Sequence, residues 1–442
     1  MYRKFNNLTE IPKYPEWNKL KREELTVELA KAYISDLNES GSGVAFFENG
    51  FKVYEDFHWK LFSDRELEQK IGAFALKIGV PKTKSDHVDY RVKWRKEVET
   101  LCDTAISSDN SLINLLNGTV EVLEDKVVLR EHRKEDYLTY VIDYEYDPNA
   151  DCPKFKDFMN ETLPEEEKQL VLSEFMGSAL DLNIKHEKVL LCYGGGANGK
   201  SVFTEIVSAA LGSQNVCNYS LGDLTSERSQ SIFRLADNFI NISTEISGNL
   251  NSSHFKKLAS GEPIKVKMLY QNPYIMRRYA RMAFNCNVLP FNKEHTEGFY
   301  RRWLIIPFEV HIPEEKQNKY LPKQIIQSEL PGVLNWIIKG LIRLKANGGT
   351  FTECESCNKE LSVYRISGNS VASFLDERYI PHDTETIPLS DLYEEYKNDC
   401  VNGNKRPVNI GNFWKRMEGL GFSRTRRNKG YVVLASQVVS SE

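Results

Sequence analysis

The most constraining feature of this 442-residue sequence is the stretch GGGANGKS at residues 194–201. It fits the phosphate-binding loop pattern G-x-x-x-x-G-K-[ST] without a mismatch. Residues 188–193 before it form a short apolar run, and residues 202–211 after it carry apolar side chains at helical spacing. Strand, glycine-rich turn and helix is the context that this motif requires, so a chance glycine-rich turn is the weaker interpretation.

The residue types in this loop suit a nucleoside triphosphate. Glycines let backbone N–H groups approach phosphates that a side chain would block. Lys200 can reach the β- and γ-phosphates, and the Ser201 hydroxyl can hold Mg²⁺. The predicted nucleotide-binding residues are Gly194, Gly195, Gly196, Ala197, Asn198, Gly199, Lys200, Ser201 and Val202.

Composition limits how the chain could bind nucleic acid. Hydrophobic residues make up 41% and charged residues 27% of the sequence, which is an ordinary soluble profile. We find no apolar run long enough for a membrane span and no signal-peptide core, so we expect a cytoplasmic protein whose eight cysteines are free thiols. The net charge is −4, so any contact with nucleic acid must come from local patches.

Cys354 and Cys357 form the one compact cysteine pair. A zinc site needs four ligands, and no second C-x-x-C or H-x-x-x-H completes this pair. Cys400 and His382 are distant alternatives whose spacing gives no support. We favour an incidental surface pair over a metal site.

Residues 1–150 look like a separate mixed α+β module. The pattern predicts helices over residues 20–37 and 66–78, a hairpin at Asn49 and Gly50, and short strands beside Gly118. The module has no phosphate loop, no D-x-D acids and no set of zinc ligands, so a polymerase or primase centre is not supported. An accessory or oligomerisation domain is favoured, and a turn-rich run after residue 144 marks its end.

Three strands with polar ends follow the loop. Residues 238–245 form an apolar run that ends in Glu245, which could polarise the attacking water or support Mg²⁺; an exposed glutamate at a helix start is the alternative. Residues 279–290 end in amides, and Asn287 could touch the γ-phosphate or that water. Arg301 and Arg302 precede the third strand, and arginine supplied across a subunit boundary stabilises a transferring phosphoryl group.

The segment around residues 264–276 predicts a hairpin that presents lysines and tyrosines. Lysines beside aromatic rings suit the backbone and bases of single-stranded nucleic acid, although a solvated strand face is the better interpretation of the segment taken alone. The candidate DNA-contacting residues in this region are Lys256, Lys257, Lys265, Lys267 and Tyr270.

Together these motifs resemble those of superfamily 3 helicases. The series reads GGGANGKS, ISTE, KKLASGEPI, NVLP and RRWLIIPF, within roughly residues 155–310. More narrowly, the chain resembles the helicase part of the phage and plasmid primase–helicase family, which is related to poxvirus-type primase–helicases. Residues 117–118, 136–139 and 146–153 also look like that family's domain before the helicase.

The resemblance implies a P-loop NTPase core of the AAA+-like type, with ATP and Mg²⁺ as cofactors. It makes Lys200 and Ser201 the A motif, and Glu245 the acid of the B motif. It makes Asn287 the sensor of motif C, and Arg302 or its neighbour Arg301 the finger for the next subunit. In the family, hairpins like the one bearing Lys265, Lys267 and Tyr270 line a central channel and grip one DNA strand.

Two departures from the family pattern stand out. Thr244 precedes Glu245 where many P-loop enzymes have an aspartate, so Mg²⁺ could rest on Ser201 and waters alone. The hairpin tip at residues 270–272 has no basic residue. Stacking, amide contacts or Lys267 would then hold the DNA.

The C-terminal third is predicted to be a helical lid followed by a winged helix. Residues 314–345 are helical by pattern, and residues 371–379, 389–400 and 410–420 predict three further helices. A loop with Pro381 and Pro388 separates the first two of these three, and a strand–turn–strand covers residues 424–434. DNA or partner binding by this basic end is favoured modestly over a role in solubility alone. Its candidate DNA-contacting residues are Lys415, Arg416, Arg426 and Arg427.

The predicted fold is thus an α/β P-loop core with a parallel sheet between accessory modules. The predicted domains are residues 1–150 (accessory), 151–310 (ATPase), 311–365 (lid) and 366–442 (winged helix). The predicted function is an ATP-dependent superfamily 3 DNA helicase that moves 3′ to 5′ on single-stranded or forked DNA. We expect it to be hexameric and to act in the host cytoplasm, without contact with a membrane. A separate primase or polymerase is the expected partner. An ATP-regulated origin-binding initiator and a DNA-packaging ATPase are the alternatives.

Overall fold

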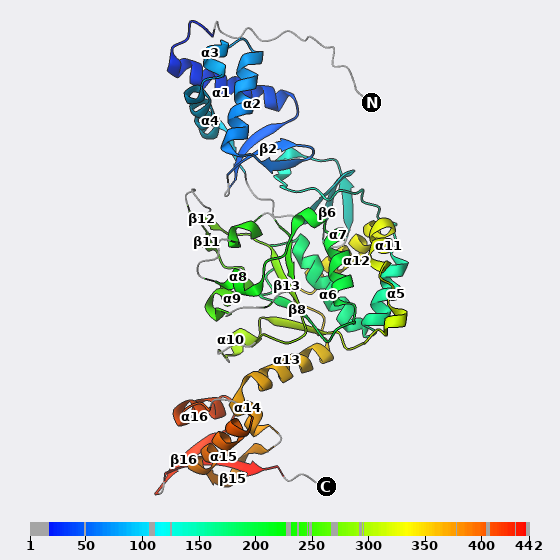
Figure 1. The fold of residues 1–442 in the computed structure, drawn as a ribbon, viewed down its shortest axis with the longest axis vertical. Coiled ribbons are helices and arrows are strands. Elements are labelled where there is room, and N and C mark those ends of the chain that lie inside the picture. Colours follow the sequence, from blue (N-terminus) through cyan, green and yellow to red (C-terminus); the bar gives the residue numbers. More distant parts are fainter. Residues whose placement is uncertain are drawn as a thin grey trace.

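The structure is a computed structural model in which three units follow one another along the longest axis (Figure 1). It describes residues 17–438 apart from short internal gaps. The residues left undescribed are 1–16, 48–49, 106–110, 124–125, 227–230, 237, 245, 247–249, 267–272, 291–293, 295, 377, 404–406, 429 and 439–442. Within the described part of the chain, no helix is both long and apolar enough to cross a membrane.

The N-terminal unit packs helices against a four-stranded sheet ordered β3-β2-β1-β4. The predicted hairpin is present, with β1 and β2 antiparallel and Phe47 opposite Gly50. Ser63 and Glu66 form a capping box that starts the second helix. The elements are α1 (Arg22–Glu39), β1 (Gly43–Phe47), β2 (Gly50–Glu55), β3 (His58–Leu61), α2 (Asp64–Lys77), α3 (Lys82–Ser85), α4 (Val88–Leu101) and β4 (Asp103–Thr104).

A small antiparallel sheet joins this unit to the next. It consists of β5 (Ser111–Leu115), β6 (Gly118–Val122) and β7 (Val127–Arg130), followed by the 3₁₀ turn η1 (Lys134–Asp136). Its apolar residues, such as Ile113 and Val120, belong to the hydrophobic cluster of the central unit. The cluster of the N-terminal unit extends only to Cys102. The hydrophobic cores therefore divide between residues 102 and 111, well before the boundary predicted near residue 150.

The central unit is built on a five-stranded parallel sheet ordered β14-β8-β13-β10-β9. This confirms the predicted parallel α/β sheet. Its strands are β8 (Val189–Tyr193), β9 (Val216–Cys217), β10 (Ile240–Ser243), β13 (Arg281–Cys286) and β14 (Trp303–Pro307). A separate hairpin pairs β11 (Ile264–Val266) with β12 (Tyr274–Met276).

Helices cover both faces of this sheet. The helical elements are α5 (Pro153–Thr162), α6 (Glu166–Leu180), α7 (Lys200–Ala210), η2 (Ser213–Asn215), α8 (Leu221–Thr225), η3 (Ile232–Leu235), α9 (Ser252–Ala259), α10 (Glu297–Tyr300), η4 (Glu314–Lys316), α11 (Leu321–Ser328) and α12 (Leu330–Ala346). Successive β8 residues belong to opposite clusters: Leu190 lies in the core with α6, α7 and α12, and Leu191 in the core with α8 and α9. This alternation places β8 between two hydrophobic layers.

The predicted long helix over residues 314–345 is wrong in detail, because the chain breaks twice within it. The second break is at Glu329, whose carboxylate accepts hydrogen bonds from the backbone N–H groups of Lys154 (3.2 Å) and Phe155 (3.1 Å) and so caps α5. The following helix, α12, packs closely on α6. A Cβ at Gly177 or Gly340 would collide with the backbone of the facing helix, so these glycines permit that contact.

The C-terminal unit has its own core and three-stranded sheet, ordered β15-β17-β16. The loop predicted around Pro381 and Pro388 is instead an edge strand, where proline is tolerated because no partner needs its missing N–H. The elements are α13 (Glu355–Gly368), α14 (Ser370–Leu375), β15 (Tyr379–Pro388), α15 (Leu389–Asn402), α16 (Ile410–Glu418), β16 (Ser423–Arg427) and β17 (Gly430–Gln437). Helix α13, which the sequence pattern did not predict, carries Tyr364 into the central core and leads to this unit (Figure 1).

The Cys354 and Cys357 pair is buried, so the predicted surface location is wrong. Both side chains are 4% exposed, and their sulfurs lie 2.9 Å apart as free thiols. No three His, Cys, Asp or Glu side chains of the described residues cluster to hold a metal ion. The pair therefore contributes to packing where α13 begins.

Candidate active site

The glycine-rich loop lies at the carboxyl end of β8 and turns directly into α7. The backbone at Gly199 adopts a left-handed conformation (φ 87°), and a Cβ there would come within 2.7 Å of Thr162. Gly194 leaves no room for a Cβ because the Phe308 carbonyl oxygen stands against it. By contrast, a Cβ at Gly195 or Gly196 would meet nothing within 4 Å, so the centre of the loop is open.

The segment after β14 braces this loop. The Asn198 amide donates to the Phe308 carbonyl (3.1 Å), and the Ile312 N–H donates to the Ala197 carbonyl (2.7 Å). The loop also bonds to the neighbouring strand, because the Gly194 N–H donates to the Cys286 carbonyl (3.2 Å). Sequence reasoning missed this brace, since nothing in residues 308–312 marks them as partners of a loop more than a hundred residues earlier.

Lys200 and Ser201 form the start of α7, directly after the loop. The Lys200 ammonium is buried, and it donates to the carbonyls of Gly194 (2.7 Å) and Gly195 (2.8 Å) and to Asn198 Oδ1 (2.9 Å). Burial lowers the pKa of Lys200. Ser201 is exposed at the first turn of α7, where backbone N–H groups and the helix dipole favour an anion. The open cradle, the lysine and the free hydroxyl together fit a triphosphate and Mg²⁺.

Two asparagines at the end of β13 lie in different surroundings. Asn285 is buried, and its amide donates to Thr204 Oγ1 on α7 (3.1 Å). Its Oδ1 is buried without a hydrogen-bond partner among the described residues. Asn287 is exposed just beyond the strand, next to the residue that bonds the loop. Asn285 is therefore a packing residue, whereas Asn287 is exposed at the end of β13 beside the loop.

The acid assigned to motif B lies outside the described residues. Glu245 follows Thr244, which is exposed after β10. Because β13 separates β10 from β8 in the sheet, the end of β10 is two strands from the loop. The roles of Glu245 with water and Mg²⁺ stay predictions.

Arg301 and Arg302 differ in burial, although both lie close to Glu187. Arg302 is 8% exposed, and its guanidinium donates to Ser260 Oγ (2.8 Å) and the Gly298 carbonyl and lies 3.6 Å from Glu187. The Arg301 side chain is 57% exposed and pairs with Glu187 at 3.1 Å. Both precede β14, so they lie at the sheet edge opposite the loop and cannot reach the loop of their own subunit.

The predicted DNA-facing lysines are also divided. Lys265 lies exposed on β11, and Lys257 is exposed on α9. Lys256 instead forms an ion pair with Glu294 (2.7 Å); burial opposes ionisation of that acid, but the hydrogen bond from Lys256 helps to lower the pKa of Glu294 to about 2. Lys267 and Tyr270 lie outside the described residues.

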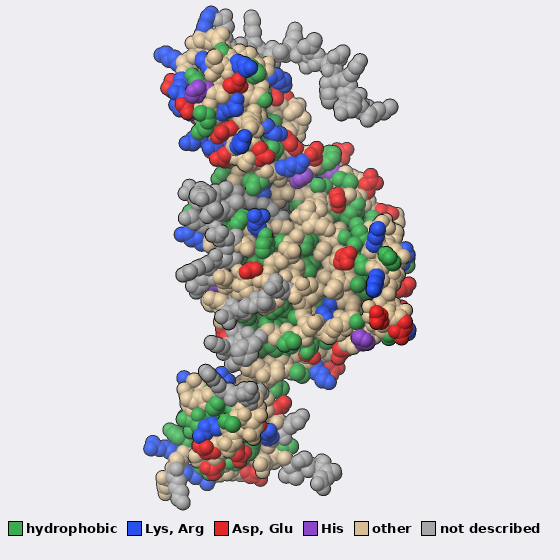
Figure 2. Space-filling view, in the orientation of Figure 1, with side chains coloured by type: hydrophobic (Ala, Val, Ile, Leu, Met, Phe, Trp, Pro, Cys, Tyr) green, Lys and Arg blue, Asp and Glu red, His purple; other side chains and the backbone are tan. Residues whose placement is uncertain are grey.

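Strand β16 of the C-terminal unit carries three arginines, Arg424, Arg426 and Arg427. All five residues of this strand are exposed. Arg424 lies between the rings of Trp414 (4.5 Å) and Tyr431 (4.1 Å). Arg426, Arg427 and Lys415 are exposed, and Arg416 is half-buried beside Asn369. On the face shown in Figure 2, by contrast, acidic and basic side chains are interspersed over the N-terminal unit.

Comparison with known families gives two matches. Residues 16–164 match the family described as D5 N terminal like, and residues 192–302 match a family of unknown function, DUF5906. The first match includes residues 117–118, 136–139 and 146–153, which resemble the domain that precedes the helicase in the primase–helicase family. The second runs from β8 to Arg302 and so contains the loop, the hairpin and the arginine pair.

The curated relatives are proteins of large DNA viruses. One named "Putative helicase", from Acanthamoeba polyphaga mimivirus, is 26% identical over 226 residues, which are 46% of this chain and 22% of that protein. One named "Putative primase", from African swine fever virus, is 23% identical over 436 residues, which are 91% of this chain and 43% of that protein. The chain is related to the phage and viral primase–helicases. It spans less than half the length of these relatives.

One solved structure has a similar fold over most of the chain. The apo structure of the NrS-1 C-terminal region covers 92% of this chain and 99% of its own, with a TM-score of 0.51 and 11% sequence identity. At this identity the likeness concerns the fold alone.

Proposed function

We propose that this primase–helicase relative is an ATP-dependent DNA helicase of superfamily 3. The observation that carries the proposal is the loop at residues 194–201, in which a buried lysine and an open glycine cradle follow β8, an inner strand of the parallel sheet. The names of the viral relatives support a role in DNA replication. The primase part of that role is assigned to another protein or segment, because no such centre is evident in residues 1–150.

In this proposal the loop binds ATP through its backbone N–H groups, and Lys200 moves from its carbonyl partners to the phosphates. Ser201 holds Mg²⁺, which would neutralise charge on the phosphates when bound. Glu245 orients the attacking water, and Asn287 reports on the γ-phosphate from the end of β13. Each of these residues follows a strand of the parallel sheet in the sequence, which is the support for these roles.

The arginine pair lies at the far edge, so the proposal requires a neighbouring subunit. Arg301 is exposed and is therefore our choice for the finger, while Arg302 stays within its own subunit. A closed ring, proposed to be a hexamer, lets every loop meet a neighbour's arginine. Hydrolysis would move the β11–β12 hairpins in turn along one strand, in the 3′ to 5′ direction proposed for this family.

Unwinding of a forked DNA duplex tests this function. Wild-type protein should displace the strand with ATP, and Lys200→Ala should not. Lys323→Ala is a matched control, because Lys323 is an exposed lysine of α11 and lies outside the loop motif. ATP turnover without any strand displacement by wild-type protein would contradict the helicase proposal.

The second candidate is an ATP-regulated initiator that binds duplex DNA. The exposed arginines of β16 favour it, since a basic strand pair can contact phosphates or a groove. This candidate predicts sequence-specific duplex binding that Arg416→Ala weakens. Equal affinity of wild-type protein for all duplexes would rule it out.

A further inference from the structure

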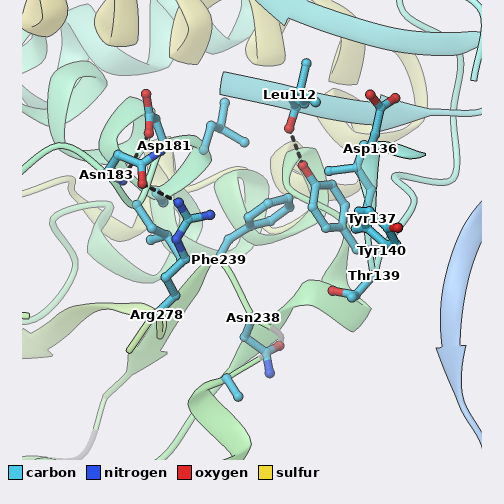
Figure 3. Close-up of a pocket in the computed structure, with 15 residues that line it drawn as sticks. Leu112, Asp136, Tyr137, Thr139, Tyr140, Asp181, Asn183, Asn238, Phe239 and Arg278 are labelled. Carbon is cyan, nitrogen blue, oxygen red and sulfur yellow. Dashed lines mark hydrogen bonds between the residues drawn. The ribbon is translucent and has the colours of Figure 1, made fainter. Parts of the chain in front are cut away.

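Two adjoining cavities lie at the amino edge of the central sheet, beside the base of the hairpin. The first, about 180 Å³, lies between residues 136–140 and the connector that follows α6 (Figure 3). The second, about 220 Å³, is lined by residues 182–188, 258–261 and 277–282. The two share Leu182, Asn183 and Arg278, so we treat them as one groove, the junction groove.

The junction groove has an excess of positive charge in a chain that is acidic overall. Its lysines and arginines are Lys185, Lys188, Arg277, Arg278 and Arg281. Its three acids are already engaged: Asp136 pairs with Arg130 (2.8 Å), Glu187 with Arg301 (3.1 Å), and Asp181 with Ser111 and Lys345. Lys185 and Arg277 are exposed, so an anion in solution can reach both side chains.

Aromatic and amide groups line the other end of the groove. In Figure 3, Asn183 and Arg278 lie on one side of the first cavity, and Tyr137, Thr139 and Tyr140 on the other. Arg278 donates to Asn183 Oδ1 at 2.6 Å, which fixes the guanidinium at the point where the two cavities meet. Asn238 adds a further amide at the edge of the cavity.

The N-terminal unit holds Tyr137 in place through Trp59, a residue of β3. The Tyr137 ring stacks on the Trp59 ring with centroids 5.5 Å apart and an interplanar angle of 26°. The Trp59 indole donates to the Lys134 carbonyl (2.8 Å), and its backbone N–H donates to the Leu138 carbonyl (2.8 Å). This half-buried ring is therefore fixed before any ligand arrives.

We propose that the junction groove binds a short stretch of single-stranded DNA, as a contact site separate from the hairpin. Phosphates lie along Lys185, Arg277 and Arg278, and a base stacks near Tyr137 with Asn183, Asn238 and Thr139 as hydrogen-bonding groups. Arg277 and Arg278 directly follow β12, so a strand held by the hairpin can continue into the groove. A single strand fits because it exposes bases and phosphates together. The inference rests on the proposed function as a DNA motor.

Equilibrium binding of a fluorescent oligo(dT) to the full chain tests the groove. Lys185→Glu and Arg277→Glu should each weaken binding about tenfold, and each should lower the salt dependence by about 0.7 in log–log slope. Lys323→Glu, an exposed charge reversal on α11, should leave the affinity unchanged. Tyr137→Leu should weaken binding, and Tyr137→Phe should keep it, because stacking needs the ring and not the hydroxyl.

The outcomes separate the groove from the motor. If wild-type protein unwinds DNA and both charge-reversal variants keep wild-type affinity for oligo(dT), the groove does not bind DNA. The helicase proposal then stays intact. Groove-dependent binding in a protein that never unwinds DNA supports the groove and overturns the motor. Displacement of oligo(dT) by thymidine monophosphate at a similar concentration overturns the strand assignment, because it shows a site for single nucleotides.

Discussion

The two edges of the central sheet suit phosphate in different ways. At the carboxyl edge, eight consecutive residues form a glycine-rich loop that ends in one buried lysine and a serine. At the amino edge, the cations come from side chains on three separate segments, at residues 185–188, 277–281 and 301–302. The first edge depends on backbone shape, and the second depends on charge. Substitutions should therefore affect them differently, and each prediction below tests that difference.

The largest effect is expected at the amino edge. Arg301→Ala should lower ATP turnover by about a thousandfold, the scale of an arginine finger, with ATP binding retained. Arg365→Ala is a matched control, since Arg365 is also exposed and paired with one acid, Glu297. Steady-state ATPase and nucleotide titrations measure both quantities. Wild-type turnover in Arg301→Ala would transfer the role to Arg302.

At the carboxyl edge, Lys200→Ala should lower turnover by about a hundredfold or more, because the phosphates lose their cation. Gly199→Ala should have a similar effect for a different reason. Its left-handed backbone and the nearby Thr162 leave no place for a methyl group. A Gly199→Ala protein that is fully active would show that loop shape is not limiting.

A smaller effect on ATP turnover is expected at the β11–β12 hairpin, the proposed DNA contact. Lys265→Ala should lower DNA-stimulated ATPase about threefold while basal ATPase is kept, because Lys265 is exposed on a hairpin that is separate from the sheet carrying the loop. Lys323→Ala should change neither rate. Equal loss of basal and stimulated rates in Lys265→Ala would argue against a DNA contact.

The smallest effect concerns stability. Ala197 has φ of 56°, a left-handed conformation that costs about 1 kcal/mol for a residue with a Cβ. Ala197→Gly should therefore raise the free energy of unfolding by up to about 1 kcal/mol, less the added entropy of the unfolded chain. Thermal denaturation measures the change. Clear destabilisation would show that the strained alanine makes a contact that the loop needs.

The same contrast between the edges explains what the sequence could predict. The loop is a continuous motif, so its strand, its helix and its residues follow from local pattern alone. The hairpin register and the helices α1, α2 and α7 were likewise predictable, because their apolar spacing is local. The division between Arg301 and Arg302 was not, because it depends on Glu187 and Ser260 from two distant segments.

Other misses have the same origin. The edge strand β15 contains two prolines, which locally indicate a loop, and only pairing with β17 makes it a strand. The burial of Cys354 and Cys357 depends on α13 packing against the central core, which no local signal reveals. The hydrophobic cores of the N-terminal and central units divide just after residue 102. This division arises because β5 and β6 pack into the cluster that is formed mainly by α5, α6, α7 and α12.

Mixing two inactive variants tests the central claim most directly, namely that the two edges meet across a subunit boundary. Lys200→Ala lacks the loop lysine, and Arg301→Ala lacks the finger, so each alone should hydrolyse ATP at about a hundredth of the wild-type rate or less. In randomly mixed rings, about a quarter of the interfaces would combine an intact loop with an intact finger. The account predicts ATPase recovery to about a quarter of the wild-type rate. A mixture as inactive as its components, in rings shown to exchange subunits, would contradict it.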